Sequence, residues 1–188
     1  MMKKYNARQK SVLIYAVVIV VILLDQITKN IVKSSMYLYQ SIPLLGDFFR
    51  LTYIENPGMA FGIQFHNKVW FTLLSVVAAI IVLIYLLRMA NDKIVFRLAM
   101  ALILGGAVGN LIDRLLFGKV VDFLDVEFFD LSIPAFDVLF ISFPGYALTR
   151  WPVFNIADSA VTCGMIILTW IIFFQKSYLE REATTEGA

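Results

Sequence analysis

The chain has 188 residues, of which 60% are hydrophobic and 16% are charged, and its mean hydropathy is +0.80. A soluble domain carries about 25% charged residues, and a chain this small cannot bury so large an apolar fraction in a single core. The net charge of +2 is too small to indicate a polyanion partner. The composition excludes an ordinary cytosolic enzyme, a disordered chain and a nucleic-acid binder, and it predicts an integral membrane protein.

The chain contains one cysteine, Cys163, and one histidine, His66. A single cysteine excludes an internal disulfide, a CxxC redox pair and a structural zinc cluster. A single histidine excludes a histidine-rich metal centre and disfavours a serine–histidine triad. We therefore expect no metal and no other cofactor. We expect Cys163 to be a small core residue, and both residues to be dispensable.

Four segments are long and apolar enough to cross a bilayer, whose hydrocarbon core requires roughly 20 residues of helix. They cover approximately residues 11–32, 69–87, 94–116 and 155–174. The first is not a cleaved signal peptide, because its apolar run continues into Asp25-Gln26-Ile27-Thr28-Lys29 without a small-residue cleavage site. The sequence predicts a membrane all-α fold, a four-transmembrane-helix bundle forming one domain over 1–176, with a polar tail over 177–188.

Basic residues gather before the first span, between the second and third, and after the fourth. They are Lys3, Lys4, Arg8, Lys10, Arg88, Lys93, Arg97, Lys176 and Arg181. An even number of spans puts these regions on one side, which the positive-inside rule assigns to the cytoplasm. Both termini are then cytoplasmic, and the long connections, about 33–68 and 117–154, lie outside.

The two outer connections are predicted to contain short β-rich elements. Residues 41–55 alternate well enough for a strand pair, closed by the turn-forming Asn56-Pro57-Gly58. The stretch 123–154 is rich in aromatic and β-branched residues and is broken by prolines. We expect it to form short strands and turns that lie on the membrane.

Polar side chains within apolar spans are costly and are functional candidates by default. Asp25 and Lys29, four residues apart near the outer end of the first span, share a helix face. They either neutralise each other and orient the helix, or have a direct chemical role. Judged by residue type alone, Asn56-Pro57-Gly58 is favoured as a turn entering the second span.

The third span carries small residues at every fourth position, Ala101, Gly105 and Gly109. Such a stripe allows another helix to approach closely. Asn110, Asp113 and Arg114 follow on one face, where the last two can form a buried ion pair.

The fourth span opens with a polar stripe, Asn155, Asp158, Ser159 and Thr162. Helix capping and the helix dipole explain the first two residues but not the whole stripe. Asp122 follows the end of the third span, so the topology places Asp122 and Asp158 at the same outer boundary. Two carboxylates about 3 Å apart share one proton and titrate as a unit. The charged member can deprotonate water while the neutral one donates to a carbonyl oxygen. On the residues alone, this aspartic-protease chemistry and a transport or ion-binding role both remain open.

Five short sequence blocks lie between residues 25 and 160, and their order along the chain is specific to one protein family. They are D-Q-I-T-K (25–29), E-N-P-G-M-A-F-G (55–62), G-G-A-V-G-N-L-I-D-R (105–114), G-K-V-V-D-F (118–123) and F-N-I-A-D-S-A (154–160). In these blocks the chain resembles the lipoprotein signal peptidase family, also called signal peptidase II, which are bacterial membrane aspartic proteases.

The resemblance implies cleavage of lipid-modified prolipoproteins just before their diacylglyceryl-cysteine, at the extracytoplasmic side of the bacterial cytoplasmic membrane. It implies that Asp122 and Asp158 are the catalytic dyad. Supporting roles fall to the other motif positions, Asp25, Lys29, Asn56, Gly58, Asn110, Asp113, Arg114, Asn155 and Ala157. Of these, Asn155 is expected to touch substrate. The implied partners are prolipoprotein substrates and membrane lipids, with no nucleic acid, and the protein is expected to be a monomer.

One departure from the family is an added stretch around 132–150, which leaves both aspartates in place. We expect one or both of the stretches 132–146 and 41–55 to act as a movable cover over the dyad. Two other functions are considered. A small transporter or proton channel would use Asp25, Asp113, Asp122 and Asp158 as a relay, but the inner halves of all four spans are apolar. A structural membrane protein would tolerate asparagine at either position of the dyad.

Overall fold

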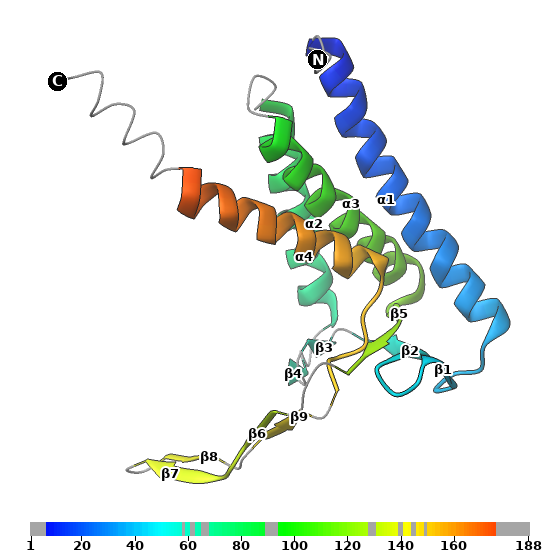
Figure 1. Cartoon of the computed structure of the whole chain (residues 1–188). Helices are drawn as coiled ribbons and strands as arrows, with labels where there is room; N and C mark the ends of the chain where they lie inside the picture. Colours follow the sequence, from blue (N-terminus) through cyan, green and yellow to red (C-terminus); the bar gives the residue numbers. More distant parts are fainter. Residues whose placement is uncertain are drawn as a thin grey trace. The chain divides into compact units, whose positions relative to one another are not determined.

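A computed structural model describes residues 7–57, 59–60, 63–64, 68–88, 94–127, 131–138, 141–143, 146–148 and 150–175. The chain forms two compact units (Figure 1). The first contains Met1–Thr28, Asn67–Gly118 and Ile156–Ala188, and the second contains Lys29–His66 and Lys119–Asn155. The predicted site residue Gly58 lies outside the described residues, as do His66 and the predicted tail over 177–188.

Long apolar runs form the helices of the first unit. The helices are α1 (Ala7–Ser35), α2 (Lys68–Arg88), α3 (Ile94–Phe117) and α4 (Ile156–Trp170), which continues as the π-helix η1 (Ile171–Gln175). The last turns of α1, from Lys29 onward, belong to the second unit. The helices begin and end within a few residues of the four apolar segments of the sequence.

Within the part of the chain that the structure describes, three helices are long and apolar enough to cross a membrane. They cover Ser11–Ser35, Ile94–Phe117 and Ile156–Phe174, and a shorter apolar helix covers Thr72–Arg88. Large apolar side chains on α1, such as Ile19 and Leu23, are more than half exposed, as side chains facing lipid are. The helices support a multi-pass membrane protein, while the fourth span and the cytoplasmic termini stay predictions.

Small residues on α3 bring its neighbours close, as the stripe predicted. A Cβ on Gly105 would lie 2.8 Å from Cβ of Val21 on α1, and one on Gly106 would lie 2.3 Å from the Ala157 carbonyl oxygen on α4. On α4, a Cβ on Gly164 would lie 2.7 Å from the backbone oxygen of Ala99. These distances leave no room for a side chain, so the glycines set how closely α1 and α4 pack on α3.

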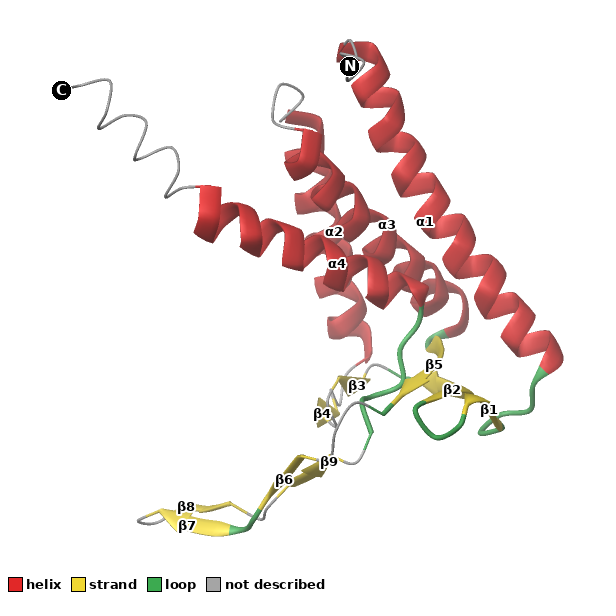
Figure 2. Cartoon of the chain, in the orientation of Figure 1, coloured by secondary structure: helices red, strands yellow, loops and turns green. Residues whose placement is uncertain are grey.

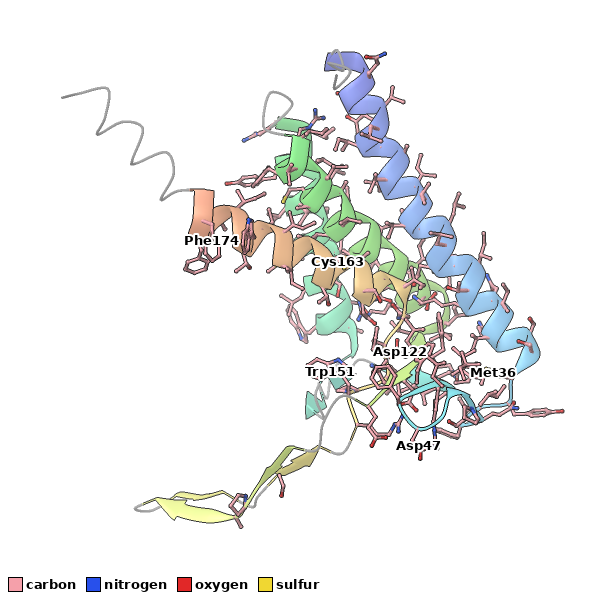
Figure 3. All side chains as sticks on the ribbon, in the orientation of Figure 1. Met36, Asp47, Asp122, Trp151, Cys163 and Phe174 are labelled. Atoms are coloured by element: carbon pink, nitrogen blue, oxygen red, sulfur yellow. The ribbon has the colours of Figure 1, made fainter. Side chains whose placement is uncertain are left out.

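Cys163 is exposed on α4 (Figure 3), so the prediction of a core position was wrong. Helix α4 packs through Ala157, Ala160 and Gly164, which are its buried residues. Because each residue advances about 100° around a helix, Cys163 falls beside this face rather than on it. Thr162 is also exposed, so the predicted polar stripe fades after the first turn of α4.

The second unit is built on a three-stranded antiparallel sheet in the order β1-β2-β5. Its strands are β1 (Ser41–Leu45), β2 (Phe49–Asn56) and β5 (Val120–Val126). The predicted strand pair over 41–55 is confirmed, but its turn lies at Gly46, whose φ is +56°. Asn56 instead ends β2. The third strand, β5, comes from the other outer connection, a pairing that the sequence did not predict.

The remaining strands form three short antiparallel pairs. They are β3 (Met59–Ala60) with β4 (Ile63–Gln64), β6 (Leu131–Ile133) with β9 (Tyr146–Leu148), and β7 (Phe136–Val138) with β8 (Ile141–Phe143). The last two pairs, β6 with β9 and β7 with β8, form a hairpin arm from the added stretch around 132–150 (Figure 2). The prediction of short strands in 123–154 is therefore confirmed.

Candidate active site

Asp122 lies in the middle of β5 and is 2% exposed. Asn56 donates from Nδ2 to Asp122 Oδ2 at 3.1 Å, and Asn155 donates from Nδ2 to Oδ1 at 2.7 Å. The Asn155 amide also donates to the Val121 carbonyl oxygen at 3.1 Å. Each oxygen of this carboxylate therefore receives a side-chain amide, and the orientation of the carboxylate is fixed from both sides.

The register of the sheet explains how Asn56 reaches Asp122. Asp122 pairs with Ile54 across the strands, and Asn56 pairs with Val120. Asn56 is therefore the diagonal neighbour of Asp122 on the same face of the sheet, within reach of a side-chain hydrogen bond. The residues beside Asp122, Val121 and Phe123, are buried. The carboxylate of Asp122 therefore lies between two buried apolar residues.

Glu55, next to Asn56, is a residue to which the sequence assigned no role. It forms an ion pair with Lys119 and accepts a hydrogen bond from the Tyr53 hydroxyl at 3.1 Å. The hydrogen bond from Lys119 lowers the pKa of Glu55, while burial, aided by Glu55, raises the pKa of Tyr53 to about 12. The ionised Glu55 thus links the end of β2 to the start of β5.

Asp158 lies half-buried in the first turn of α4, where the helix dipole favours a carboxylate. Asn110, on α3 and 7% exposed, donates from Nδ2 to Asp158 Oδ1 at 2.7 Å. The predicted residues Asn110 and Asp158 are therefore brought together in the helical unit.

Asp25, which is fully buried, acts on the same turn of α4. Its Oδ1 accepts the backbone N–H of Ala157 at 3.0 Å, satisfying an amide that the helix itself leaves without a partner. A Cβ on Gly109 would lie 2.7 Å from Asp25 Oδ2, so only glycine leaves space for this carboxylate.

Gln26 is a residue that the sequence reasoning missed, although it stands in the D-Q-I-T-K block. Its Nε2 donates to Asp113 Oδ1 at 3.1 Å, to the Gly109 carbonyl oxygen at 3.1 Å and to Asp25 Oδ2 at 3.2 Å. A neutral side-chain amide can donate hydrogen bonds to two buried carboxylates at once. The sequence signal that could have identified Gln26 is therefore an amide next to Asp25 within an apolar span. Gln26 thereby ties α1 to α3 beside the carboxylate that caps α4.

Two more of the predicted site residues are Arg114 and Lys29. Arg114 donates from Nη1 to the Ser75 hydroxyl on α2 at 3.3 Å. Lys29 is 2% exposed and lies in the sheet unit. Over the described residues, no three His, Cys, Asp or Glu side chains are grouped as metal ligands.

Residues 17–174 match the family described as signal peptidase (SPase) II. The chain belongs to the signal peptidase II family. It is 38% identical over 164 residues to the lipoprotein signal peptidase of Moorella thermoacetica, covering 87% of this chain and 95% of that protein. It is 41% identical over 171 residues to the one from Pelodictyon phaeoclathratiforme, covering 88% and 92%.

Solved structures of bacterial membrane enzymes obtained by the in meso method are similar as well. One matches with a TM-score of 0.68 and 29% identity over 95% of this chain and 94% of that chain. Another matches with a TM-score of 0.69 and 29% identity over 93% and 98%. Membership of the signal peptidase II family confirms the resemblance drawn from the five sequence blocks and makes the protein a membrane peptidase.

Proposed function

We propose that the protein is an aspartic endopeptidase that removes signal peptides from diacylglyceryl-modified prolipoproteins, cutting before the lipidated cysteine with Asp122 and Asp158 as its catalytic dyad. The observation that carries this proposal is the amide bonding of the two carboxylates. Asp122 receives amides from Asn56 and Asn155, and Asp158 receives one from Asn110. Donors held in place before the reaction keep reacting groups in a fixed orientation without reorganisation.

In the proposed reaction the two carboxylates share one proton and act as a unit. The ionised member takes a proton from water, and the water oxygen adds to the scissile carbonyl carbon. The protonated member donates to the carbonyl oxygen, which gives a tetrahedral intermediate. The member that took the proton from water then gives it to the amide nitrogen, while the other member takes a proton from a hydroxyl group of the intermediate. The C–N bond breaks, the carbonyl group re-forms as a carboxylic acid, and the dyad returns to its starting state.

The membrane contributes to this reaction by confining the substrate. The acyl chains of a diacylated substrate remain in the bilayer and hold the scissile bond near the membrane surface. Holding enzyme and substrate in one plane removes part of the entropy cost of their encounter. We place the site on the extracytoplasmic side of the cytoplasmic membrane, with four spans, both termini inside and one peptidase domain over 1–176, acting as a monomer. One or both of the hairpin arm and the β1–β2 hairpin serve as a movable cover over the dyad.

The test is cleavage of a synthetic diacylated prolipoprotein by the purified protein. Asp122→Asn and Asp158→Asn should each lower turnover by roughly 10²- to 10⁴-fold, the scale of a lost general acid or base. The matched control is Asp47→Asn in the β1–β2 turn, where the side chain is 75% exposed, and turnover should not change. Circular dichroism should show all three variants folded. Full turnover by either dyad variant would contradict the assignment.

A further inference from the structure

The chain that returns from the hairpin arm to α4, residues 150–155, pairs with β5. Trp151 donates its backbone N–H to the Val126 carbonyl oxygen at 3.1 Å. Leu124 and Phe154 exchange backbone hydrogen bonds in both directions, at 2.7 and 3.0 Å. Because β2 already occupies one edge of β5, this return segment (150–155) occupies the other edge.

Within the described part of the chain, the backbone hydrogen bonds between the return segment and β5 involve two residues of the segment, Trp151 and Phe154. Pro152 lies within it and has no N–H to donate to a strand. Yet the segment ends at Asn155, whose amide must reach Asp122 Oδ1 at 2.7 Å. A slip of one residue along β5 would turn every side chain of the segment to the opposite face. Its register therefore needs a further constraint.

Arg150 supplies a constraint at the first residue of the segment. Its Nε donates to Asp125 Oδ1 at 2.7 Å, and its Nη1 pairs with Glu127. Asp125 is 5% exposed, and its other oxygen accepts the Thr52 hydroxyl of β2 at 2.6 Å. The hydrogen bond to Asp125 raises the pKa of Arg150, so the guanidinium stays charged.

The hydrogen-bonded chain continues across the whole sheet. Thr52 is 2.8 Å from the Ser41 hydroxyl of β1, so side chains of β1, β2, β5 and the return segment are linked in one row. A paired and hydrogen-bonded charge is a specific anchor, because displacing either partner leaves a desolvated charge behind. The row fixes Arg150 relative to β5, three residues along the strand from Asp122.

We propose that Arg150 and Asp125 are positioning residues for the peptidase reaction: their ion pair fixes the register of the return segment on β5 and so holds the Asn155 amide on Asp122. This role rests on the proposed catalytic function of Asp122. The pair closes the base of the hairpin arm, because the arm lies between Asp125 and Arg150 in the sequence.

The test compares Arg150→Gln, Asn155→Ala and the double variant in the full-length protein with diacylated substrate. Arg150→Gln should lower kcat about tenfold and leave KM within about twofold, since the lost interaction acts on the reaction and not on substrate binding. In the Asn155→Ala background, adding Arg150→Gln should change kcat no further, because residues that act through one contact are not additive. Asp125→Asn should behave like Arg150→Gln.

Matched variants separate positioning from a loss of stability. Arg50→Gln removes a different ion pair of this unit, with Asp47 in the β1–β2 turn, and should leave kcat unchanged. Arg150→Lys keeps the charge but cannot reproduce both contacts, and it should retain more activity than Arg150→Gln. If Arg150→Gln fails to fold, the same cycle with Arg150→Lys decides the question. Additive losses in the cycle, or an unchanged kcat for the folded variant, would overturn the positioning role.

Asp122→Asn in the same assay separates this proposal from the proposed function. If that variant is inactive while the Arg150 and Asn155 effects add independently, the dyad stands and only the positioning role is wrong. If Asp122→Asn is fully active, the dyad assignment is wrong, and the positioning role, which is defined through Asp122, falls with it.

Discussion

The carboxylate of Asp25 on α1 accepts the backbone N–H of Ala157 on α4 at 3.0 Å, although 132 residues separate them in the sequence. A helix normally receives its N-terminal cap from its own chain, within one turn. Here a neighbouring helix supplies an acceptor for the N–H one residue before Asp158. The position of this candidate catalytic aspartate is thus coupled to the packing of α1.

Asp25→Ala should lower both stability and turnover, because it leaves the Ala157 N–H buried without its acceptor. An unsatisfied buried donor costs about 1–3 kcal/mol. Asp25→Asn should be milder, since its carbonyl oxygen can still accept that N–H. Thermal unfolding and cleavage rates of the two variants check this order. Equal effects of the two substitutions would show that the charge of Asp25, and not its cap, is what matters.

Gly106→Ala should be strongly destabilising. The added methyl group would lie 2.3 Å from the Ala157 carbonyl oxygen, which is backbone and cannot rotate away. Overpacking of this kind typically costs about 1–3 kcal/mol, and here it also displaces the start of α4, so turnover should fall as well. Leu115→Ala on the same helix is the control, because that side chain is 64% exposed. A melting temperature unchanged by Gly106→Ala would mean that α4 packs less closely on α3.

The ion pair of Glu55 with Lys119 should make stability depend on acidic pH. The pKa of Glu55 in the folded protein lies below its ordinary 4.5, so its contribution is complete above that value and is lost as the pH falls through the lower folded pKa. Glu55→Gln should therefore differ in melting temperature from the parent protein near neutral pH, and the difference should shrink below about pH 4. Lys119→Gln should show the same convergence. A difference that stays constant with pH would rule out the ion pair as its cause.

Cys163→Ala should leave cleavage within about twofold of the parent rate. The thiol is exposed on α4 and has no place in the proposed reaction. Activity lowered by roughly 10²-fold, the scale of a lost general base, would reveal a role in the chemistry.

The helices could be predicted from sequence because a bilayer demands long apolar runs, and such runs are visible without knowledge of the fold. The face that each helix presents to its neighbours was harder to predict. In lipid, the outward and the buried faces of a helix are both apolar, so small residues mark the contact better than hydrophobicity does. The stripe at Gly105 and Gly109 was therefore recognised, whereas Cys163 was assigned to the core.

The candidate residues were recognised from motifs, but most of their contacts were not. Asn56 and Asp122 meet because β2 pairs with β5, and strand alternation carries no information on which strand is the partner. Gln26 was overlooked because a neutral amide carries no charge that marks it as costly within a span. From the sequence, Asp25 is a partner of Lys29 or a group with a direct chemical role. Neither reading predicts that it accepts a hydrogen bond from a helix far along the chain.

The pairing of β2 with β5 has a consequence for biosynthesis. Between Asn56 and Val120 the ribosome must make all of α2 and α3. The amide that holds one oxygen of Asp122 therefore exists long before its carboxylate partner. The strand that carries it has β1 as a neighbour at once but must wait for β5 while two hydrophobic helices emerge. Contacts so distant in sequence close late and slowly. A nascent chain that ends before β5 lacks Asp122, and one that ends before α4 also lacks Asp158. If these two residues are the catalytic dyad, as proposed, the enzyme stays inactive until its fourth helix has been made.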